Sequence, residues 1–227
     1  MRFATLIIFG LVLALVPVTR AETISFYDDT FNPEDWESSI FYEEGNGGVY
    51  SWQQELVGGN PGAFMMIVNT VFSAPPYSMI RVFYHQVGAV YDPSTQGAIL
   101  SIDYSEDSIM LEGGGDGQGS GPTLEQDGVV FVAPRFLTPE TEWTPHVLTG
   151  LTQDDFAVWD DPDHHPDFSI NGSPIFFGFQ RGNATYSGGY TIVGGIDNWT
   201  TTLHTEGCTP TSPATWAGIK RAFGGEE

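Results

Sequence analysis

Short runs of apolar residues recur along most of the chain, separated by turn-forming residues such as glycine, proline and asparagine. In several runs apolar and polar positions alternate with a period of two, as in residues 143–148, which is typical of strands with one buried and one solvated face. The pattern predicts ten strands, over residues 24–27, 49–57, 63–70, 77–91, 98–104, 108–111, 129–133, 143–148, 175–180 and 190–203.

These strands follow one another without helical segments between them and without a repeat of fixed period, which argues against parallel α/β folds, propellers and solenoids. Glycine is abundant, 14% of residues are aromatic, and Lys220 is the only lysine, so the composition favours strands over helices. We therefore predict an all-β fold, a two-sheet antiparallel β-sandwich of the jelly-roll type.

Two stretches depart from this pattern. Residues 113–121 are rich in glycine and are predicted to form a flexible hairpin loop. Residues 209–213 are expected to form a linker, and residues 215–223 one or two helical turns.

The N-terminus has the features of a secretory signal. An apolar run over residues 3–16 follows Arg2 and ends at Pro17, and small residues at Thr19 and Ala21 suit cleavage after Ala21. The run is shorter than the roughly 17–25 residues of a membrane-spanning helix, so no membrane insertion of the mature chain is expected. The predicted organisation is a signal peptide (1–21), a β-sandwich domain (22–205) and a linker with a short tail (206–227), in a protein that is secreted or at the cell surface.

The charge balance excludes some partners. The chain has 29 acidic and 7 basic residues, so nucleic acid is excluded as a partner and an anionic membrane surface is disfavoured. Arg81, Arg135 and Arg181 are each expected to pair with a carboxylate rather than to bind an anionic sugar. Cys208 is the only cysteine, which rules out an intramolecular disulfide and leaves either an inert linker thiol or an intermolecular attachment point.

Four segments carry a family resemblance: FYDDTFNPEDW (26–36), GGNPGA (58–63), EWTP (142–145) and GGIDNWT (194–200). Together they resemble jelly-roll domains of secreted bacterial proteins, namely the galactose-binding-like superfamily with its calcium-containing carbohydrate-binding modules, and laminin IV type A domains. The resemblance covers roughly residues 24–203.

The resemblance implies a structural calcium ion that joins the region of the first strand to an aspartate on the closing strand. Asp197 matches the closing-strand position, and Asp28 or Asp29 would be the partner. Calcium is also expected on physical grounds, because it takes six to eight oxygen ligands and relieves repulsion in an acidic protein.

The densest acidic cluster lies at residues 159–168. It is not an EF-hand, because Pro166 and Gly172 stand where that loop needs glycine and glutamate, and the adjacent His164 and His165 suit zinc poorly. We expect an exposed acidic loop, with a calcium or mixed-metal site and a catalytic site as alternatives.

Catalytic motifs are absent from the sequence. No serine lies in a Gly-x-Ser-x-Gly turn between a strand and a helix. Some jelly-roll glycosidases carry Glu-x-Asp-x-x-Glu on one strand, and the nearest approach here, residues 125–130, has Val130 in place of the second glutamate. We therefore predict that the protein is not an enzyme.

Aromatic side chains suggest carbohydrate binding, because a ring face packs against the C–H groups of a sugar. The preferred positions are Trp52, Tyr84, Trp143 and Trp159, with Tyr77 and Tyr91 as further candidates, and a core position is the alternative for each. The predicted function is a secreted, non-catalytic binding module for extracellular polysaccharide or glycan. The alternatives are a structural or adhesive protein that contacts cell-envelope components without a small ligand, and a glycoside hydrolase or lyase on the same scaffold.

Overall fold

The computed structural model describes residues 21–113, 118–138 and 140–207. The predicted signal peptide, Cys208, the linker and the helical tail lie outside these residues. Across the described ranges no helix is both long enough and apolar enough to span a membrane.

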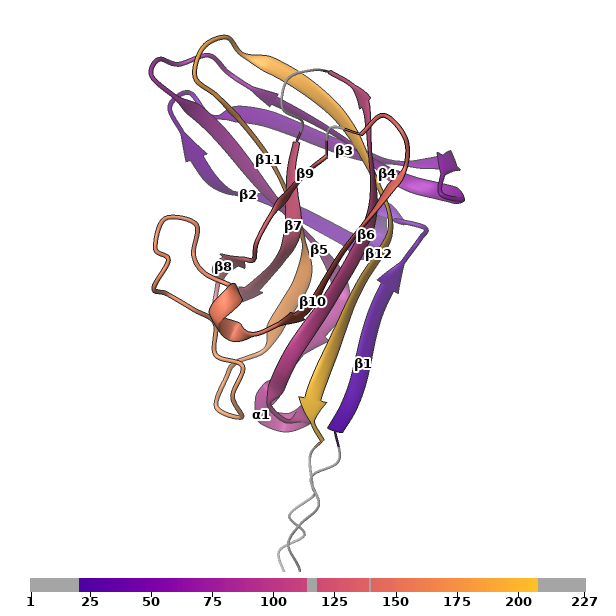
Figure 1. The fold of residues 1–227 in the computed structure, drawn as a ribbon, viewed down its shortest axis with the longest axis vertical. Coiled ribbons are helices and arrows are strands. Elements are labelled where there is room, and N and C mark those ends of the chain that lie inside the picture. The colour runs from indigo at the N-terminus through magenta and orange to yellow at the C-terminus, as the bar shows by residue number, and fades with distance from the viewer. Residues whose placement is uncertain (1–20, 114–117, 139, 208–227) are drawn as a thin grey trace, which may run out of the picture.

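The described strands form two antiparallel sheets packed face to face, which confirms the predicted all-β sandwich (Figure 1). The first sheet has the order β10 (Thr144–Leu151), β6 (Ile99–Glu112), β12 (Tyr190–Glu206), β4 (Gly62–Val71) and β3 (Gly48–Gly59), with β1 (Ala21–Asp28) also paired to β12. The second sheet has the order β2 (Trp36–Glu44), β5 (Ser78–Tyr91), β11 (Ile175–Thr185), β7 (Gln118–Gln126) and β8 (Val129–Val132), with β9 (Phe136–Thr138) paired to β7. The described helical elements are short: η1 (Pro33–Asp35), α1 (Pro93–Gln96) and η2 (Gln153–Asp155).

All ten predicted strands are present, and the two predicted over residues 98–104 and 108–111 form one continuous strand, β6. The sequence pattern missed β2, β7 and β9. The prediction of a loop over residues 113–121 is wrong for its second half, because Gln118 opens β7 and Gly119 pairs with β11. Glycine has no side chain, so a glycine-rich strand lacks the alternation of apolar and polar residues by which strands are predicted. Such a strand becomes evident only from its pairing with a neighbouring strand.

The core lies between the sheets and is dominated by aromatic rings. Trp36 and Trp199 meet edge to face with ring centroids 5.1 Å apart, and Tyr84 stacks on Phe179 at 5.0 Å. Because β5 alternates, Tyr84 points into this core whereas the side chains on either side of it point to the outer face of the second sheet. That outer face is where the candidate site lies.

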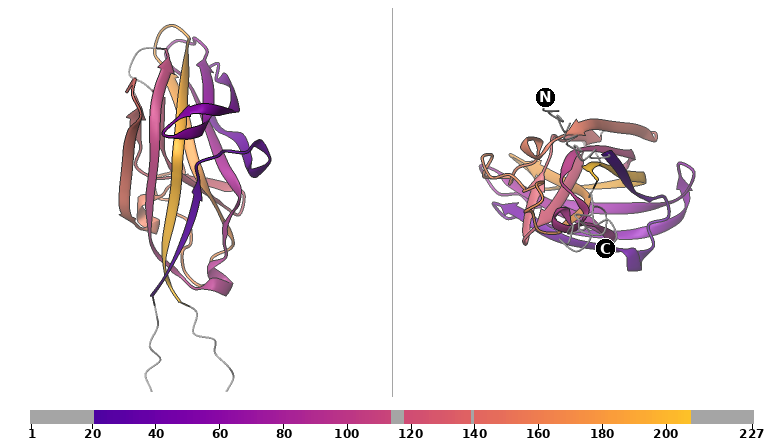
Figure 2. Two further views of the ribbon diagram at one scale, coloured as in Figure 1. Left: turned by 90° about the vertical axis from the view of Figure 1, so that its right-hand side faces the viewer. Right: turned by 90° about the horizontal axis from the view of Figure 1, so that it is seen from below.

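The first and last described strands lie side by side (Figure 2). Strand β1 pairs with β12 in antiparallel register, from Ala21 opposite Glu206 to Asp28 opposite Trp199. This confirms the expectation that the closing strand runs beside the opening one.

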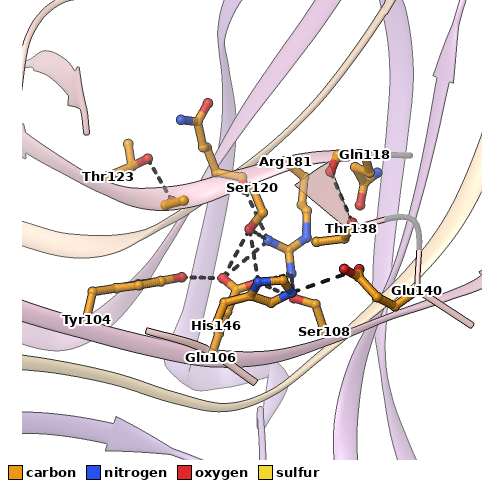
Figure 3. Close-up of polar contacts among 12 residues, drawn as sticks. Tyr104, Glu106, Ser108, Gln118, Ser120, Thr123, Thr138, Glu140, His146 and Arg181 are labelled. Carbon is orange, nitrogen blue, oxygen red and sulfur yellow. Dashed lines mark hydrogen bonds and ion pairs between the residues drawn. The ribbon is translucent and has the colours of Figure 1, made fainter. Parts of the chain in front are cut away.

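A buried ion pair connects the two sheets across the core (Figure 3). Glu106 on β6 and Arg181 on β11 lie with Oε1 and Nη2 2.9 Å apart, and both side chains are at most 1% exposed. The Glu106 carboxylate also accepts hydrogen bonds from the hydroxyl groups of Tyr104, Ser108 and Ser120. The expectation that Arg181 pairs with a carboxylate is thereby confirmed.

We predict that Glu106→Gln lowers the free energy of unfolding by about 3–5 kcal/mol, because it leaves the buried Arg181 cation without a counter-ion. Urea unfolding at neutral pH measures the change. The matched control is Glu112→Gln, at the exposed end of the same strand, which should change stability by less than about 0.5 kcal/mol. Equal stability of the two variants would contradict the structural role of the pair.

Candidate ligand pocket

A hollow of about 700 Å³ opens at one end of the second sheet. It is formed by β5, β7, β9 and β11 together with the turn that leads from β11 into β12. The side chains that give it chemical character are Tyr77, Arg81, Arg135, Leu137 and Tyr186.

Paired glycines form part of the floor of this pocket. Gly182 of β11 lies opposite Gly119 of β7 in the sheet register. A Cβ atom added at Gly182 would lie only 3.1 Å from Cγ of Arg81, so the missing side chain gives Arg81 room to lie across β11. The sequence signal for this floor was the glycine-rich stretch that had been interpreted as a loop.

Two arginines and one tryptophan form a cluster at the pocket. Arg81 is 2% exposed, and its guanidinium carbon lies 3.2 Å from the centre of the Trp159 ring. The guanidinium carbon of Arg135 lies 4.8 Å from the same ring centre. Trp159 comes from the segment between η2 and β11, so cation–π contacts join that segment to the sheet.

The positive charges of this cluster are not balanced by nearby acids. Among the described residues neither Arg81 nor Arg135 forms an ion pair, and the prediction that each pairs with a carboxylate is therefore wrong for both within those ranges. Burial, followed by the charge of Arg135, lowers the pKa of Arg81 to about 9. Arg81 remains protonated at neutral pH, held in place by Trp159 and by a hydrogen bond from its Nη1 to Oε1 of Gln180.

An aromatic pair lies at the same pocket. The rings of Tyr77 and Tyr186 have centroids 4.8 Å apart at an angle of 47°. Tyr186 is 79% exposed, so most of its surface is available to a ligand. Tyr186 is not among the candidates predicted from the sequence, although an aromatic residue next to the turn-forming Ser-Gly-Gly of residues 187–189 is a signal for exposure.

Two of the four preferred aromatic candidates pack against the core. Tyr84 is fully buried, so it presents no ring face to a ligand, and its position follows from the inward phase of β5. Trp52 is partly buried against the core, and its Nε1 donates a hydrogen bond of 2.9 Å to Oγ of Ser38.

The other two candidates lie in different places. Trp143 precedes β10 in the first sheet, where its Nε1 donates to the carbonyl oxygen of Gly58 at 2.9 Å and its ring meets Phe64 edge to face. Trp159 contacts the arginines of the pocket. The structure therefore does not bring the four residues into one platform.

A second, smaller hollow of about 370 Å³ lies on the same sheet. It is lined by Glu37, His85, Glu125 and neighbouring residues, and Nε2 of His85 lies 3.6 Å from Oε2 of Glu37. It contains two carboxylates, and is thus the place where a hydrolase activity would have to be sought.

Asp28, one of the predicted calcium ligands, uses both carboxylate oxygens within the chain. Oδ1 accepts hydrogen bonds from the backbone and hydroxyl of Thr30, each at 2.7 Å, and from the backbone of Phe31 at 3.0 Å. Oδ2 accepts from Nε1 of Trp36 at 2.7 Å. Burial raises the pKa of Asp28, but the bonds from Trp36, Phe31 and Thr30 outweigh it and hold the pKa below its ordinary value. Asp28 thus anchors the turn after β1.

Asp197 lies in a more acidic setting. Its Oδ1 accepts from the backbone of Asn198 at 2.7 Å and its Oδ2 from the backbone of Asn60. Burial, with the negative charges of Asp107 and Asp29, raises the pKa of Asp197. The described residues nevertheless contain no group of three or more His, Cys, Asp or Glu side chains placed to hold a metal ion.

The predicted acidic loop is exposed at Asp160, Asp161 and Asp163. Its two histidines make separate contacts: His164 meets Phe131 edge to face, and Nδ1 of His165 lies 2.8 Å from the carbonyl oxygen of Phe156. They do not converge on one site.

No known family model matches the chain, and no curated protein matches it. Among solved structures, a family 11 carbohydrate-binding module of a cellulosomal cellulase from Clostridium thermocellum is similar at 15% identity and TM-score 0.45, over 83% of this chain and 96% of that one. The C-terminal family 22 carbohydrate-binding module of Clostridium thermocellum Xyn10B is similar at 9% identity and TM-score 0.40, over 81% and 94%. A protein of unknown function from Shewanella oneidensis MR-1 is similar at 10% identity and TM-score 0.44, over 87% and 93%.

We predict that Asp28→Asn lowers the free energy of unfolding by about 1–3 kcal/mol at pH 7, because four donors lose a charged acceptor. The pKa of Asp28 in the folded chain lies below its ordinary value of 3.8. The stability that the ionised carboxylate contributes is therefore complete above pH 3.8 and is lost as the pH falls through the folded pKa. Urea unfolding of both proteins should therefore show a difference in the free energy of unfolding at pH 7 that narrows as the pH falls below 3.8.

The control for this comparison is Asp29→Asn in chelator-containing buffer, since Asp29 is the exposed neighbour of Asp28. It should change stability by less than about 0.5 kcal/mol. If the difference in the free energy of unfolding between wild type and Asp28→Asn stays constant with pH, the ionised carboxylate does not stabilise the fold as proposed.

Proposed function

We propose that the protein is a non-catalytic carbohydrate-binding domain and that the pocket at the end of the second sheet receives a segment of an extracellular glycan. The observation that carries this proposal is a hollow of about 700 Å³ that combines a pair of tyrosine rings, of which Tyr186 is exposed, with guanidinium donors. This volume lies within the range of roughly 300–1,000 Å³ that is usual for small-molecule sites.

The chemistry of the lining suits a sugar. The ring of Tyr186 offers an apolar face to the C–H groups of a pyranose, and its exposure leaves that face accessible. Arg135 supplies N–H donors for ring substituents. A sugar needs both kinds of contact, because it has an apolar face and a polar rim.

The same lining supports a binding role over catalysis. The described residues that form the pocket include no Asp, Glu, His or Cys, whereas hydrolysis of a glycosidic bond requires a pair of carboxylates in most families. The smaller hollow has Glu37 and Glu125 but only about half the volume, 370 Å³. The hydrolase alternative therefore lacks support at the larger site.

The predicted signal peptide gives the reason to look for the glycan outside the cell. The solved structures similar to this chain include carbohydrate-binding modules, but similarities of this degree establish no shared ligand. The proposal accordingly rests on the pocket.

We predict that the chain binds at least one polysaccharide on a glycan array and that Tyr186→Ala weakens this binding about tenfold, through loss of a stacking ring. Titration calorimetry with the array hit measures the change. The matched control is Tyr27→Ala, which removes a tyrosine that is 52% exposed on β1 of the other sheet and should leave the affinity unchanged. An array without hits at high protein concentration, or equal effects of the two variants, would contradict the proposed site.

Calcium stays a prediction of the sequence. Its predicted ligands are Asp197 together with Asp28 or Asp29, and amide and backbone carbonyl oxygens would complete the set. We expect calcium at about 100 times its dissociation constant to raise the Tm by about 5–10 °C, and Asp197→Asn to remove the response. Asp154→Asn, an exposed acid in η2, is the control. Equal melting curves of the wild type with calcium and with chelator would show that no stabilising calcium binds.

A further inference from the structure

The positive charge of the described chain is concentrated at the pocket. The described residues contain three basic side chains, and one of them, Arg181, is neutralised in the core by Glu106. The other two, Arg81 and Arg135, both lie on the ring of Trp159 and both line the pocket. The chain has 29 acidic residues, yet these two neighbouring cations form no ion pair with any of those that the structure describes. This arrangement requires an explanation.

The burial of Arg81 makes its missing counter-ion significant. A charged group removed from water is costly unless it is paired, and Arg81 is 2% exposed. Burial, followed by the positive charge of the neighbouring Arg135, lowers the pKa of Arg81. Such local conflicts are expected at functional sites, where a ligand completes the arrangement.

Several N–H groups at the pocket lack acceptors within the described ranges. Nε and Nη1 of Arg81 contact Met79 and Gln180, whereas its Nη2 and all of Arg135 make no hydrogen bond there. A guanidinium that lies over an aromatic ring keeps its N–H edge free for an oxyanion, so these donors suit an acid group.

We infer that the pocket selects an acidic saccharide, whose carboxylate or sulfate group binds between Arg81 and Arg135 while its ring packs on the tyrosine pair. This inference deepens the proposed function and rests on it. It also reverses the expectation that these arginines are paired within the protein. A neutral sugar would leave both cations without a counter-ion, whereas a uronic acid or a sulfated sugar neutralises them.

The experiment is a calorimetric titration of the intact chain at pH 7 with an oligogalacturonate and with its methyl ester of the same length, which differs only in charge. A sulfated galactan oligosaccharide forms a third arm and distinguishes sulfate from carboxylate recognition. The buffer contains chelator, so that calcium cannot bridge acids on the ligand and the protein. We expect at least one acidic ligand to bind about tenfold or more tightly than the methyl ester.

Arg135→Gln tests the assigned residue, because Arg135 is exposed and its removal leaves the core intact. It should weaken binding of the acidic ligand about tenfold more than it weakens binding of the neutral methyl ester, because only the acidic ligand loses an ion pair. The matched control is Leu56→Glu, which makes the same change in net charge at a residue that is 71% exposed on β3 of the other sheet. It should leave the affinity for the acidic ligand as it is in the wild type.

The outcomes separate this inference from the proposed function. Equal binding of acid and methyl ester, equal effects of the two variants, or Tyr186-dependent binding that is confined to neutral glycans would overturn the inference and leave the carbohydrate site standing. Absence of binding to every glycan tested would overturn both.

Discussion

The ion pair between Glu106 and Arg181 fixes how the two sheets are placed against each other. Glu106 belongs to β6 and Arg181 to β11, a central strand of the second sheet, so the pair joins the sheets through the middle of the core. A strand alternates its side chains, and a slip of one residue would move Arg181 to the outside. That slip would leave Glu106 buried without a cation, so the pair selects one phase of β11.

The phase of β11 in turn determines the pocket. With Arg181 pointing inward, its neighbours Gln180 and Gly182 face outward. Gln180 then accepts a hydrogen bond from Arg81, and Gly182 gives the Arg81 side chain the space that it occupies. Core and pocket therefore depend on the same register, although they lie on opposite faces of one strand.

Sequence reasoning predicted the parts of this structure that depend on local alternation. The period of two identified the strand β5, but it could not say which of its two faces is buried. The sandwich buries the Tyr84 face, and this sets aside a residue chosen for sugar stacking. Strand β7 was missed because its glycines show no alternation until Gly119 is paired with Gly182. The charged partner of each arginine could not be predicted from the sequence either, because Arg181 and Glu106 are 75 residues apart in the chain.

The pocket lies near the start of β12, far from the end of that strand that pairs with β1. Tyr186 and its turn precede the start of β12, whereas Glu206 at its other end pairs with Ala21 of β1. The strand has 17 residues, which at about 3.3 Å per residue gives a separation of about 50 Å between these ends. Figure 1 shows β1 and the end of β12 at the bottom of the sandwich, away from the turn that joins β11 to β12. Asp28 anchors the turn after β1 through its hydrogen bonds with Thr30 and Trp36. Because the pocket and the paired ends of β1 and β12 lie at opposite ends of the sandwich, a polymer can bind at the pocket without contact with those paired ends.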